Sequence, residues 1–407
     1  MQCGLLGRTL AHSYSPQIHS YLGDYPYTLF EQEPENVGKF LQENDFTAIN
    51  VTIPYKKDVM PYCAELTECA KKMGAVNTIV RRPDGSLIGH NTDYFGLHYT
   101  FRRMGLSLQG KKVLVLGSGG ASVTTVIVLK ELGANVVIIS RSGENNYSNL
   151  HLHRDASAIV NTTPVGMYPN AGISPVDLDI FPHLEGVLDI IYNPARTKLL
   201  LDAAERNIPC ENGLWMLVAQ AKESAEWFTG SKISDDIIPE IYDKMCKRME
   251  NIVLVGMPGC GKSTVGQILA RELGREFIDA DAQIVKESGM SIPEIFKKKG
   301  EAGFRQIETR VLARLGQESC LVIATGGGCV TRAENYAHLH QNGIIYWIKR
   351  DISTLSTDGR PLSQAGVLSQ MYQIRRPLYE QFSDYSVTNN GRPEDAVKNI
   401  LKGWNAR

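Results

Sequence analysis

The clearest chemical signature in the sequence is a Gly-x4-Gly-Lys-Ser pattern at residues 256–263. An apolar run precedes it and a helical pattern follows it, which is the order that a phosphate-binding loop (P-loop) requires. Backbone N–H groups of such a loop hold the β-phosphate of a nucleotide, its lysine reaches the β and γ oxygens, and its serine hydroxyl ligates Mg²⁺. We therefore expect a nucleoside triphosphate to be bound by a set of neighbouring residues: Gly259, Cys260, Gly261, Lys262, Ser263 and Thr264.

Two carboxylates follow this loop in the run Phe277-Ile278-Asp279-Ala280-Asp281. The run predicts the end of a strand, and alternation about Ala280 would place both carboxylates on one face. Carboxylate oxygens can ligate Mg²⁺ or take a proton from an acceptor hydroxyl. The spacing alone leaves open how Asp279 and Asp281 divide these roles.

A second glycine turn, Gly117-Ser118-Gly119-Gly120-Ala121, follows the apolar strand pattern at 111–116. It would let the backbone approach a pyrophosphate at a helix N-terminus, although such a turn on its own is about as often a plain tight turn. The next predicted strand, 135–139, ends at Ser140-Arg141-Ser142, where an acidic residue would hold the ribose 2′-hydroxyl of NAD. A guanidinium and two hydroxyls suit the 2′-phosphate of NADP instead.

These turns need strand–turn–helix units to position them, and the two units lie too far apart in the chain to share one sheet. A polar stretch that ends in a charged helix separates them, so we place the main boundary near residue 248. The predicted fold class is α/β, with a substrate-binding subdomain at 1–95 and 213–248 and a Rossmann-type dinucleotide-binding subdomain at 96–212. A P-loop domain, with a parallel sheet in three α/β/α layers, is expected at 249–407.

The composition excludes several classes of protein. The chain has 407 residues, of which 43% are hydrophobic and 21% charged, so it can form several folded domains. Lys and Arg number 43 against 44 Asp and Glu, and this balance gives no basic surface for nucleic acid or an anionic membrane. No apolar run reaches the roughly 18 residues of a membrane span. The eight cysteines form no CxxC pair and the first residues do not resemble an export signal, so we expect reduced thiols and a cytoplasmic protein.

A series of short motifs in the first part of the chain carries a family resemblance. The motifs are His12-Ser13-Tyr14-Ser15-Pro16, Asn50-Val51-Thr52-Ile53-Pro54-Tyr55-Lys56, Gly74-Ala75-Val76-Asn77-Thr78, Gly89-His90-Asn91-Thr92-Asp93, Asn161-Thr162-Thr163-Pro164-Val165-Gly166-Met167, Tyr192-Asn193-Pro194 and Gly213-Leu214-Trp215-Met216-Leu217-Val218-Ala219-Gln220-Ala221. In this order, over residues 1 to about 230, they resemble shikimate dehydrogenase. The resemblance implies that this region reduces 3-dehydroshikimate to shikimate with NADPH.

The resemblance also implies roles for individual residues. Lys56 and Asp93 look like the catalytic pair, because an ammonium held by a carboxylate can supply the proton that a carbonyl oxygen needs during reduction. Ser13 and Ser15 would hold the substrate carboxylate, since their hydroxyls share one face of an extended segment. The other substrate contacts implied are Thr52, Tyr192, Asn77, Asp93 and Gln220, and the cofactor contacts implied are Gly117, Ser118, Gly119, Gly120, Ala121, Ser140, Arg141, Ser142, Ile190 and Gly213.

The second part of the chain carries a different set of motifs. Besides the P-loop and the Asp279–Asp281 pair, they are Gly300-Glu301-x-x-Phe304-Arg305-x-x-Glu308, Thr325-Gly326-Gly327-Gly328, Arg360-Pro361-Leu362 and Arg375-Arg376-Pro377-Leu378-Tyr379. Over residues 250–405 the set is similar to shikimate kinase. The resemblance implies transfer of a phosphoryl group from ATP to shikimate, with Mg²⁺ as the metal.

By this second resemblance, Asp279 ligates Mg²⁺ while Asp281 binds the acceptor and takes its hydroxyl proton. Arg305 and Arg375 clamp the substrate carboxylate, which the fork of a guanidinium fits well. The remaining residues implied are Ser263 for the metal, Gly327 against the substrate ring, and Lys262 and Arg360 on the transferred phosphoryl group and the nucleotide.

The sequence departs from both families at several points. Arg141 stands alone where NADP-dependent members usually carry two arginines, so a small margin of NADP over NAD is expected. The stretch 141–161 is too short for the helix and strand that the family places there, which predicts a trimmed edge of the dinucleotide-binding subdomain. In the kinase-like part the segment 360–375 is short and polar, which predicts a small or mobile lid. Ser353 and Thr354 stand where an arginine often lies on the adenine, so low nucleotide affinity is expected.

The two resemblances together predict a bifunctional enzyme for two successive steps, since the hydroxyl formed by the first reaction is the nucleophile of the second. One alternative is an NAD-linked quinate/shikimate dehydrogenase fused to a kinase for another small acid. Another is a decayed enzyme that senses nucleotides, against which the retained acid and base groups Lys56, Asp93 and Asp281 count. The sequence predicts no oligomeric state.

The single arginine at the end of its predicted strand leads to a test of cofactor choice. A charge-assisted contact to a 2′-phosphate is worth about 1.5–3 kcal/mol, or roughly one to two decades in affinity. Arg141→Ala should therefore raise the KM for NADP⁺ by roughly 10–100-fold and leave the KM for NAD⁺ almost unchanged, as measured by steady-state kinetics. An equal loss with both cofactors would show that Arg141 does not contact the phosphate.

Overall fold

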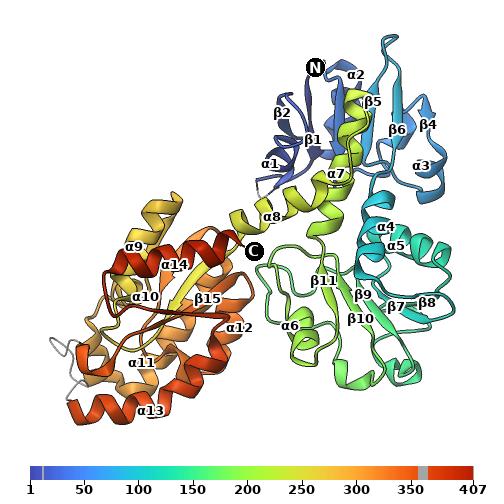
Figure 1. Ribbon diagram of the computed structural model, residues 1–407. Helices are drawn as coiled ribbons and strands as arrows, with labels where there is room; N and C mark the ends of the chain where they lie inside the picture. The colour runs from blue at the N-terminus through green and yellow to red at the C-terminus, as the bar shows by residue number, and fades with distance from the viewer. Residues whose placement is uncertain (12, 356–364, 407) are drawn as a thin grey trace. The chain divides into compact units, whose positions relative to one another are not determined.

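Three sheets, of six, five and five strands, organise the residues that the computed structural model describes, which are 1–11, 13–355 and 365–406 (Figure 1). The chain divides into two units. The first comprises Met1–Val165, Ser174–Tyr192 and Asp202–Met245, and the second comprises Gly166–Ile173, Asn193–Leu201 and Cys246–Arg407. Strands and helices alternate in both units, so the predicted α/β fold class is confirmed.

The first sheet of the first unit is mixed, with the strand order β2-β1-β3-β5-β6-β4. Its strands are β1 (Cys3–Gly7), β2 (Tyr27–Glu31), β3 (Ala48–Val51), β4 (Glu65–Leu66), β5 (Thr78–Arg81) and β6 (Leu87–His90). Strand β1 pairs in parallel with β2 and β3, whereas β5 pairs antiparallel with β3 and β6. The short helices α1 (Ser15–His19), α2 (Val37–Glu43) and α3 (Glu68–Met73) connect these strands. Apolar side chains such as Leu6, Ile49 and Ile79 form its fully buried core.

The second sheet of the first unit is entirely parallel, with the order β11-β10-β9-β7-β8. Its strands are β7 (Lys112–Leu116), β8 (Asn135–Ile139), β9 (Ala158–Asn161), β10 (Gly186–Asp189) and β11 (Cys210–Asn212). Helix α4 (Asp93–Met104) leads into it, α5 (Gly120–Glu131) follows β7, and α6 (Lys198–Glu205) precedes β11. The central strands are apolar on both faces, as expected for a parallel sheet covered by helices.

The prediction that residues 141–161 are too short for a helix and a strand is only partly correct. Strand β9 does form there, in the middle of the sheet, but among these residues the chain makes a 3-10 turn at Leu150–His153 in place of an α-helix. Asparagine side chains stabilise the preceding loop: the Asn146 N–H donates to Asn149 Oδ1 at 2.8 Å, and Asn149 Nδ2 donates to the Glu144 carbonyl at 2.8 Å. A loop closed in this way returns the chain to the sheet with few residues.

Helix α7 (Leu214–Thr229) returns from the second sheet to the first, where it contacts α1, β3 and β5 (Figure 1). Helix α8 (Ile237–Met249) follows it, and the ring of Tyr242 stacks on that of Trp215 with centroids 3.6 Å apart. The buried Lys222 ammonium pairs with Glu226 at 2.7 Å and with Asp235 at 2.8 Å. These contacts fix the polar stretch between α7 and α8.

The second unit is built on a parallel sheet with the order β13-β14-β12-β15-β16. Its strands are β12 (Asn251–Val255), β13 (Glu276–Asp279), β14 (Leu321–Ala324), β15 (Gly343–Lys349) and β16 (Tyr385–Thr388). Its helices are α9 (Lys262–Leu273), α10 (Ala280–Ser288), α11 (Ile292–Gln317, interrupted at Gly300), α12 (Glu334–His340), α13 (Ala365–Phe382) and α14 (Pro393–Asn405). Helices α9 and α14 pack together, and so do α11 and α12, so helices cover both faces of the sheet (Figure 1).

Two further findings concern the expectations from composition. Within the described residues, no helix has the length and apolar character needed to cross a membrane. All eight cysteines lie in these residues and none is in a disulfide bond. Burial raises the pKa of the Cys3 and Cys63 thiols to about 11, so both thiols are protonated at neutral pH.

Candidate active sites

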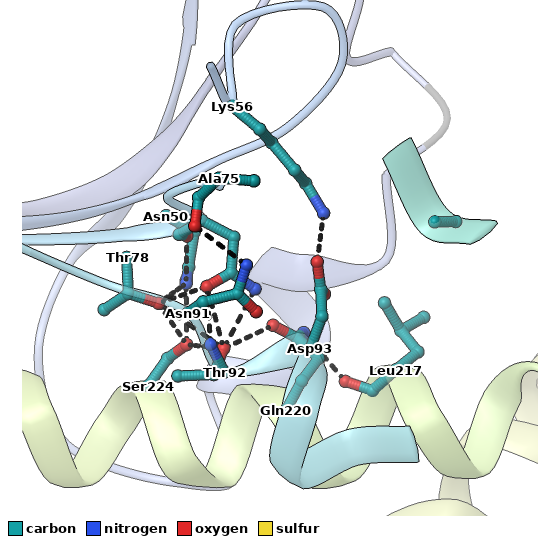
Figure 2. Close-up of polar contacts among 12 residues, drawn as sticks. Asn50, Lys56, Ala75, Thr78, Asn91, Thr92, Asp93, Leu217, Gln220 and Ser224 are labelled. Atoms are coloured by element: carbon teal, nitrogen blue, oxygen red, sulfur yellow. Dashed lines mark hydrogen bonds and ion pairs between the residues drawn. The ribbon is translucent and has the colours of Figure 1, made fainter. Parts of the chain in front are cut away.

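A buried polar cluster joins β3, β5 and α7 in the first unit (Figure 2). Asn50 Nδ2 donates to Ser224 Oγ at 2.7 Å and to Thr78 Oγ1 at 3.2 Å. The Ser224 hydroxyl lies 3.1 Å from that of Thr92, just before α4. All four side chains are buried, and hydrogen bonding within the cluster compensates for their removal from water.

This cluster holds two residues that the sequence predicts to bind substrate, Asn77 and Gln220. The Thr92 N–H donates to Asn77 Oδ1 at 2.8 Å, and the Thr92 hydroxyl donates to Gln220 Oε1 at 3.2 Å. Gln220 also donates from Nε2 to the Leu217 carbonyl at 2.9 Å, while Asn77 is only 3% exposed. Both amides are therefore fixed before any ligand binds.

Sequence reasoning missed the supporting residues Asn50, Thr92 and Ser224. Asn50 begins the motif that ends at Lys56, and Thr92 directly precedes Asp93. Ser224 follows Gln220 by one helical turn, so the helical spacing predicts that both lie on the same face of α7.

Lys56 and Asp93 come together as the sequence predicts. Lys56 Nζ lies 2.5 Å from Asp93 Oδ2, and Figure 2 shows the lysine side chain reaching from the loop after β3 to the carboxylate. Asp93 is the first residue of α4. The two side chains are 31% and 14% exposed, so the pair is accessible to a small ligand.

Ser13 and Ser15 are also close together, but not for the predicted reason. The backbone turns at Tyr14 (φ −88°, ψ 0°) and Ser15 begins α1, so the segment turns into a helix where an extended one was predicted. The Ser13 hydroxyl nevertheless donates to Ser15 Oγ at 3.2 Å. Tyr192 is brought to this segment by an edge contact with Tyr14, with ring centroids 6.2 Å apart. Thr52 is half-buried directly after β3, and its N–H donates to the Leu6 carbonyl at 2.9 Å.

The glycine turn at 117–121 fits the close approach of a dinucleotide. Gly117 has φ +104°, and a Cβ there would lie 2.9 Å from Thr162 Oγ1. Gly119 and Gly120 begin α5 with open space beside them, since a Cβ on either would meet no atom within 4 Å. Ser118 is exposed and Ala121 half-buried, so the turn has an accessible face.

The remaining predicted cofactor residues lie at the ends of other strands. Ser140, Arg141 and Ser142 follow β8, with Arg141 exposed. Gly213 packs against the backbone of Ile190, because a Cβ at this position would lie 1.9 Å from the Ile190 carbonyl oxygen. Parallel strands end at one edge of a sheet, and the residues after β7 and β8 share that edge.

The P-loop of the second unit joins β12 to α9. Its glycines 256, 259 and 261 have φ values of +146°, +82° and +96°, which other residues adopt only with strain. Lys262 is buried, and its ammonium donates to the Gly256 and Met257 carbonyls at 2.9 and 3.1 Å. Cys260 is buried in the loop, whereas Thr264 is exposed.

Asp279 and Asp281 do not share a strand face, so that prediction is wrong. Strand β13 ends at Asp279, which caps α10 by accepting the Asp281 N–H at 3.0 Å on Oδ1. Its Oδ2 accepts the Ser263 hydroxyl at 2.7 Å. The helical turn directs Asp281 elsewhere, since a Cβ on Gly326 would lie 2.9 Å from Asp281 Oδ1.

The pair Ser263 and Asp279 fits Mg²⁺ of the kind bound with nucleotides. This ion usually keeps several waters and takes one or two protein oxygens besides phosphate oxygens. No group of three or more potential metal-binding side chains of His, Cys, Asp or Glu gathers in the described part of the chain. The Ser263 hydroxyl and the Asp279 carboxylate beside the P-loop fit a Mg²⁺ site in which nucleotide phosphates and waters would supply the other ligands.

A cavity of about 1020 Å³ extends from the P-loop to the predicted acceptor residues Asp281, Arg305, Gly327 and Arg375. Arg305 is 8% exposed and donates from Nη1 to Glu308 Oε2 at 2.6 Å. Arg375 Nη1 donates to the Gly327 carbonyl at 3.1 Å. Both guanidinium groups therefore face one space, which is large enough for a nucleotide and a small acid.

Arg376 lies apart from this cavity and pairs with Glu380 at 2.9 Å on the surface. Of the two adjacent arginines, Arg375 is the one that lines the cavity. Glu308, which was assigned no role, is fully buried, and burial raises its pKa above the usual range, with the charge of Asp281 adding to the shift. The predicted lid residue Arg360 lies outside the described residues.

Comparisons with known proteins match separate parts of the chain to two families. A family model for shikimate dehydrogenase substrate binding domains matches residues 5–79, and a model for shikimate kinase matches residues 258–404. The chain is 35% identical over 259 residues to a shikimate dehydrogenase (NADP(+)) of Clostridium beijerinckii, which covers 59% of this chain and 96% of the relative.

Two solved structures resemble the same part of the chain. Shikimate dehydrogenase 1 from Peptoclostridium difficile is 37% identical, has a TM-score of 0.56 and covers 60% of this chain and 98% of its own. A shikimate 5-dehydrogenase from Thermus thermophilus, solved in complex with NADP(H) and shikimate, is 27% identical and has a TM-score of 0.55. The match covers 60% of this chain and 99% of the Thermus chain.

Proposed function

The chain belongs to the shikimate dehydrogenase family over 59% of its length and carries a shikimate kinase domain after that part, and from this premise we propose a bifunctional enzyme. It reduces 3-dehydroshikimate to shikimate with NADPH and then phosphorylates shikimate with ATP to shikimate 3-phosphate. The observation that carries the proposal is the presence in one chain of two polar sites, one around the Lys56–Asp93 pair and one in the P-loop cavity.

We place the boundary between the two enzymes at residue 248. The substrate-binding subdomain comprises 1–95 and 213–248, the dinucleotide-binding subdomain 96–212 and the kinase 249–407. One of the breaks between the compact units, at Met245–Cys246, supports this boundary, whereas residues 166–173 and 193–201 of the proposed dinucleotide-binding subdomain group with the second unit. The return of α7 to the first sheet supports the split subdomain. A cytoplasmic location is also proposed, in keeping with cysteines that form no disulfide.

In the first reaction, bound NADPH supplies the hydride. Lys56 donates a proton to the carbonyl oxygen of the substrate, and Asp93 holds the ammonium in place through its 2.5 Å contact. The hydroxyls of Ser13 and Ser15 bind the substrate carboxylate, with Thr52 and Tyr192 beside them. Asn77 and Gln220 bind ring hydroxyls from the positions that Thr92 fixes. Arg141 contacts the 2′-phosphate of the cofactor.

In the second reaction, ATP supplies the phosphoryl group and Mg²⁺ offsets its charge. Ser263 and Asp279 hold the metal, and the P-loop amides with Lys262 hold the phosphates. Asp281 takes the proton of the attacking hydroxyl, while Arg305 and Arg375 bind the carboxylate of shikimate. Arg360 is proposed to neutralise charge on the phosphoryl group.

Purified protein tests the proposal directly. Shikimate with NADP⁺ should reduce the cofactor, and shikimate with MgATP should yield ADP and a phosphorylated acid. Parallel reactions with NAD⁺ and with quinate test the NAD-linked alternative, which predicts turnover with both. If none of these mixtures gives turnover while the protein still binds nucleotides, the result would instead favour a decayed enzyme that senses nucleotides.

The proton-donor role of Lys56 predicts a selective loss. Lys56→Ala should lower the kcat of the dehydrogenase by roughly 10²–10⁴-fold, the usual contribution of a positioned acid, and leave kinase turnover intact. Lys57→Ala removes the adjacent, exposed lysine and is the matched control. A Lys56 variant that keeps kcat and loses only substrate affinity contradicts the role.

The separate positions of the two aspartates predict separate phenotypes. Asp279→Asn should raise the Mg²⁺ concentration needed for half-maximal kinase rate and be partly rescued by excess metal, because Asp279 contacts the metal-binding Ser263. Asp281→Asn should lose most kinase activity at every Mg²⁺ concentration, with MgATP still bound and dehydrogenase activity unaffected. Rescue of the Asp281 variant by Mg²⁺ would show that the roles are reversed.

A further inference from the structure

The cavity of the second unit is also lined by a cation that the roles above do not use, Arg350. It directly follows β15, which is hydrogen-bonded to β12, the strand that leads into the P-loop. A Cβ on Gly261 would lie 4.0 Å from Arg350 Nη1. The half-buried guanidinium thus lies beside the phosphate-binding loop.

The positive charge of Arg350 is not neutralised by a carboxylate within the described residues. Its Nε donates to the Thr354 hydroxyl at 3.4 Å, a long contact with a neutral group. The neighbouring carboxylate of Asp351 is held by Asn390, whose Nδ2 donates to Asp351 Oδ2 at 2.8 Å. A half-buried cation that pairs with no carboxylate of the described residues, next to a P-loop, favours an anion as its partner.

Asn389 fixes the distance between Arg350 and the P-loop. This asparagine is 2% exposed and directly follows β16. Its Nδ2 donates to the Cys260 carbonyl at 2.8 Å, and its backbone N–H donates to the Lys349 carbonyl at 2.7 Å. One buried residue therefore ties the P-loop to the backbone that carries Arg350.

The strand order indicates which part of a nucleotide reaches Arg350. Strands β14 and β13 lie on one side of β12 and lead into the proposed acceptor-side residues Gly326–Gly328 and Asp281, whereas β15 and β16 lie on the other side. The transferred phosphoryl group must lie between the P-loop and the acceptor. The rest of the nucleotide therefore leaves the P-loop on the side of Arg350.

We propose that Arg350 binds the α-phosphate of ATP from the end of β15. The inference rests on the proposed kinase function and adds a nucleotide-binding residue to it. A guanidinium offers parallel N–H donors that match phosphate oxygens. Because the α-phosphate is not transferred, Arg350 contributes to nucleotide affinity in both ATP and ADP complexes.

The test compares three variants of the full chain by calorimetry with ADP and by steady-state kinetics. Arg350→Gln should weaken ADP binding and raise the KM for ATP by roughly 10–100-fold, the loss expected for a charge-assisted contact, with the KM for shikimate unchanged. Arg350→Lys keeps the charge and should recover part of the affinity. Lys349→Gln is the matched control, since its ammonium lies 4.6 Å over the Trp347 ring, and it should bind ADP like the unaltered protein.

Unchanged ADP affinity in Arg350→Gln, or an equal loss in Lys349→Gln, would overturn the assignment. A variant that keeps ADP affinity and loses the preference for ATP over GTP would place Arg350 at the base and equally contradict it. Failure of the unaltered protein to bind ADP would contradict the kinase function itself, so the two failures are distinguishable.

Discussion

The return of α7 to the first sheet depends on buried hydrogen bonds that water cannot replace. Ser224 is fully buried and accepts Asn50 Nδ2 at 2.7 Å, and its hydroxyl lies 3.1 Å from that of Thr92. Leaving one such group without a partner costs about 1–3 kcal/mol, so the helix has one favoured register on the sheet. That register places Gln220 at Thr92 and Gly213 at the edge of the other sheet, against Ile190. One helix thus positions a residue that we propose to bind the substrate and another that we propose to bind the cofactor.

In the second unit a single carboxylate has a comparable organising role. Asp279 ends β13, caps α10 through Oδ1 and accepts the Ser263 hydroxyl through Oδ2. Because the chain turns into a helix at this residue, Asp281 is directed to Gly326 and lines the same cavity as Arg305 and Arg375. The proposed division between a metal-side and an acceptor-side carboxylate therefore follows from the backbone turn.

The features that depend on local residue type are predictable from the sequence. The glycine turns at 117–121 and 256–263 lie between a strand and a helix as predicted, since positive φ angles and helix starts are encoded within a few residues. Alternation was misleading at Asp279–Asp281, because a strand end and a capped helix start show the same spacing of polar residues. The contact between Asn50 and Ser224 joins positions far apart in the chain and has no local signal. The strand in 141–161 was not predicted, because an estimate from the length of the segment takes no account of a short loop that asparagine side chains stabilise.

Asp279 both caps α10 and contacts Ser263, and this combination affects which residues persist when an activity is lost. In a descendant without phosphoryl transfer, replacement of Asp279 would still uncap α10, at a cost of about 1 kcal/mol, so selection for a stable fold alone would oppose its loss. Lys56 differs, since its ammonium contacts Asp93 and 31% of its side chain is exposed. In a descendant that had also lost the proposed reduction, neutral drift would therefore remove Lys56 well before Asp279. A retained Lys56 is therefore stronger evidence that its reaction is still in use than a retained Asp279 is.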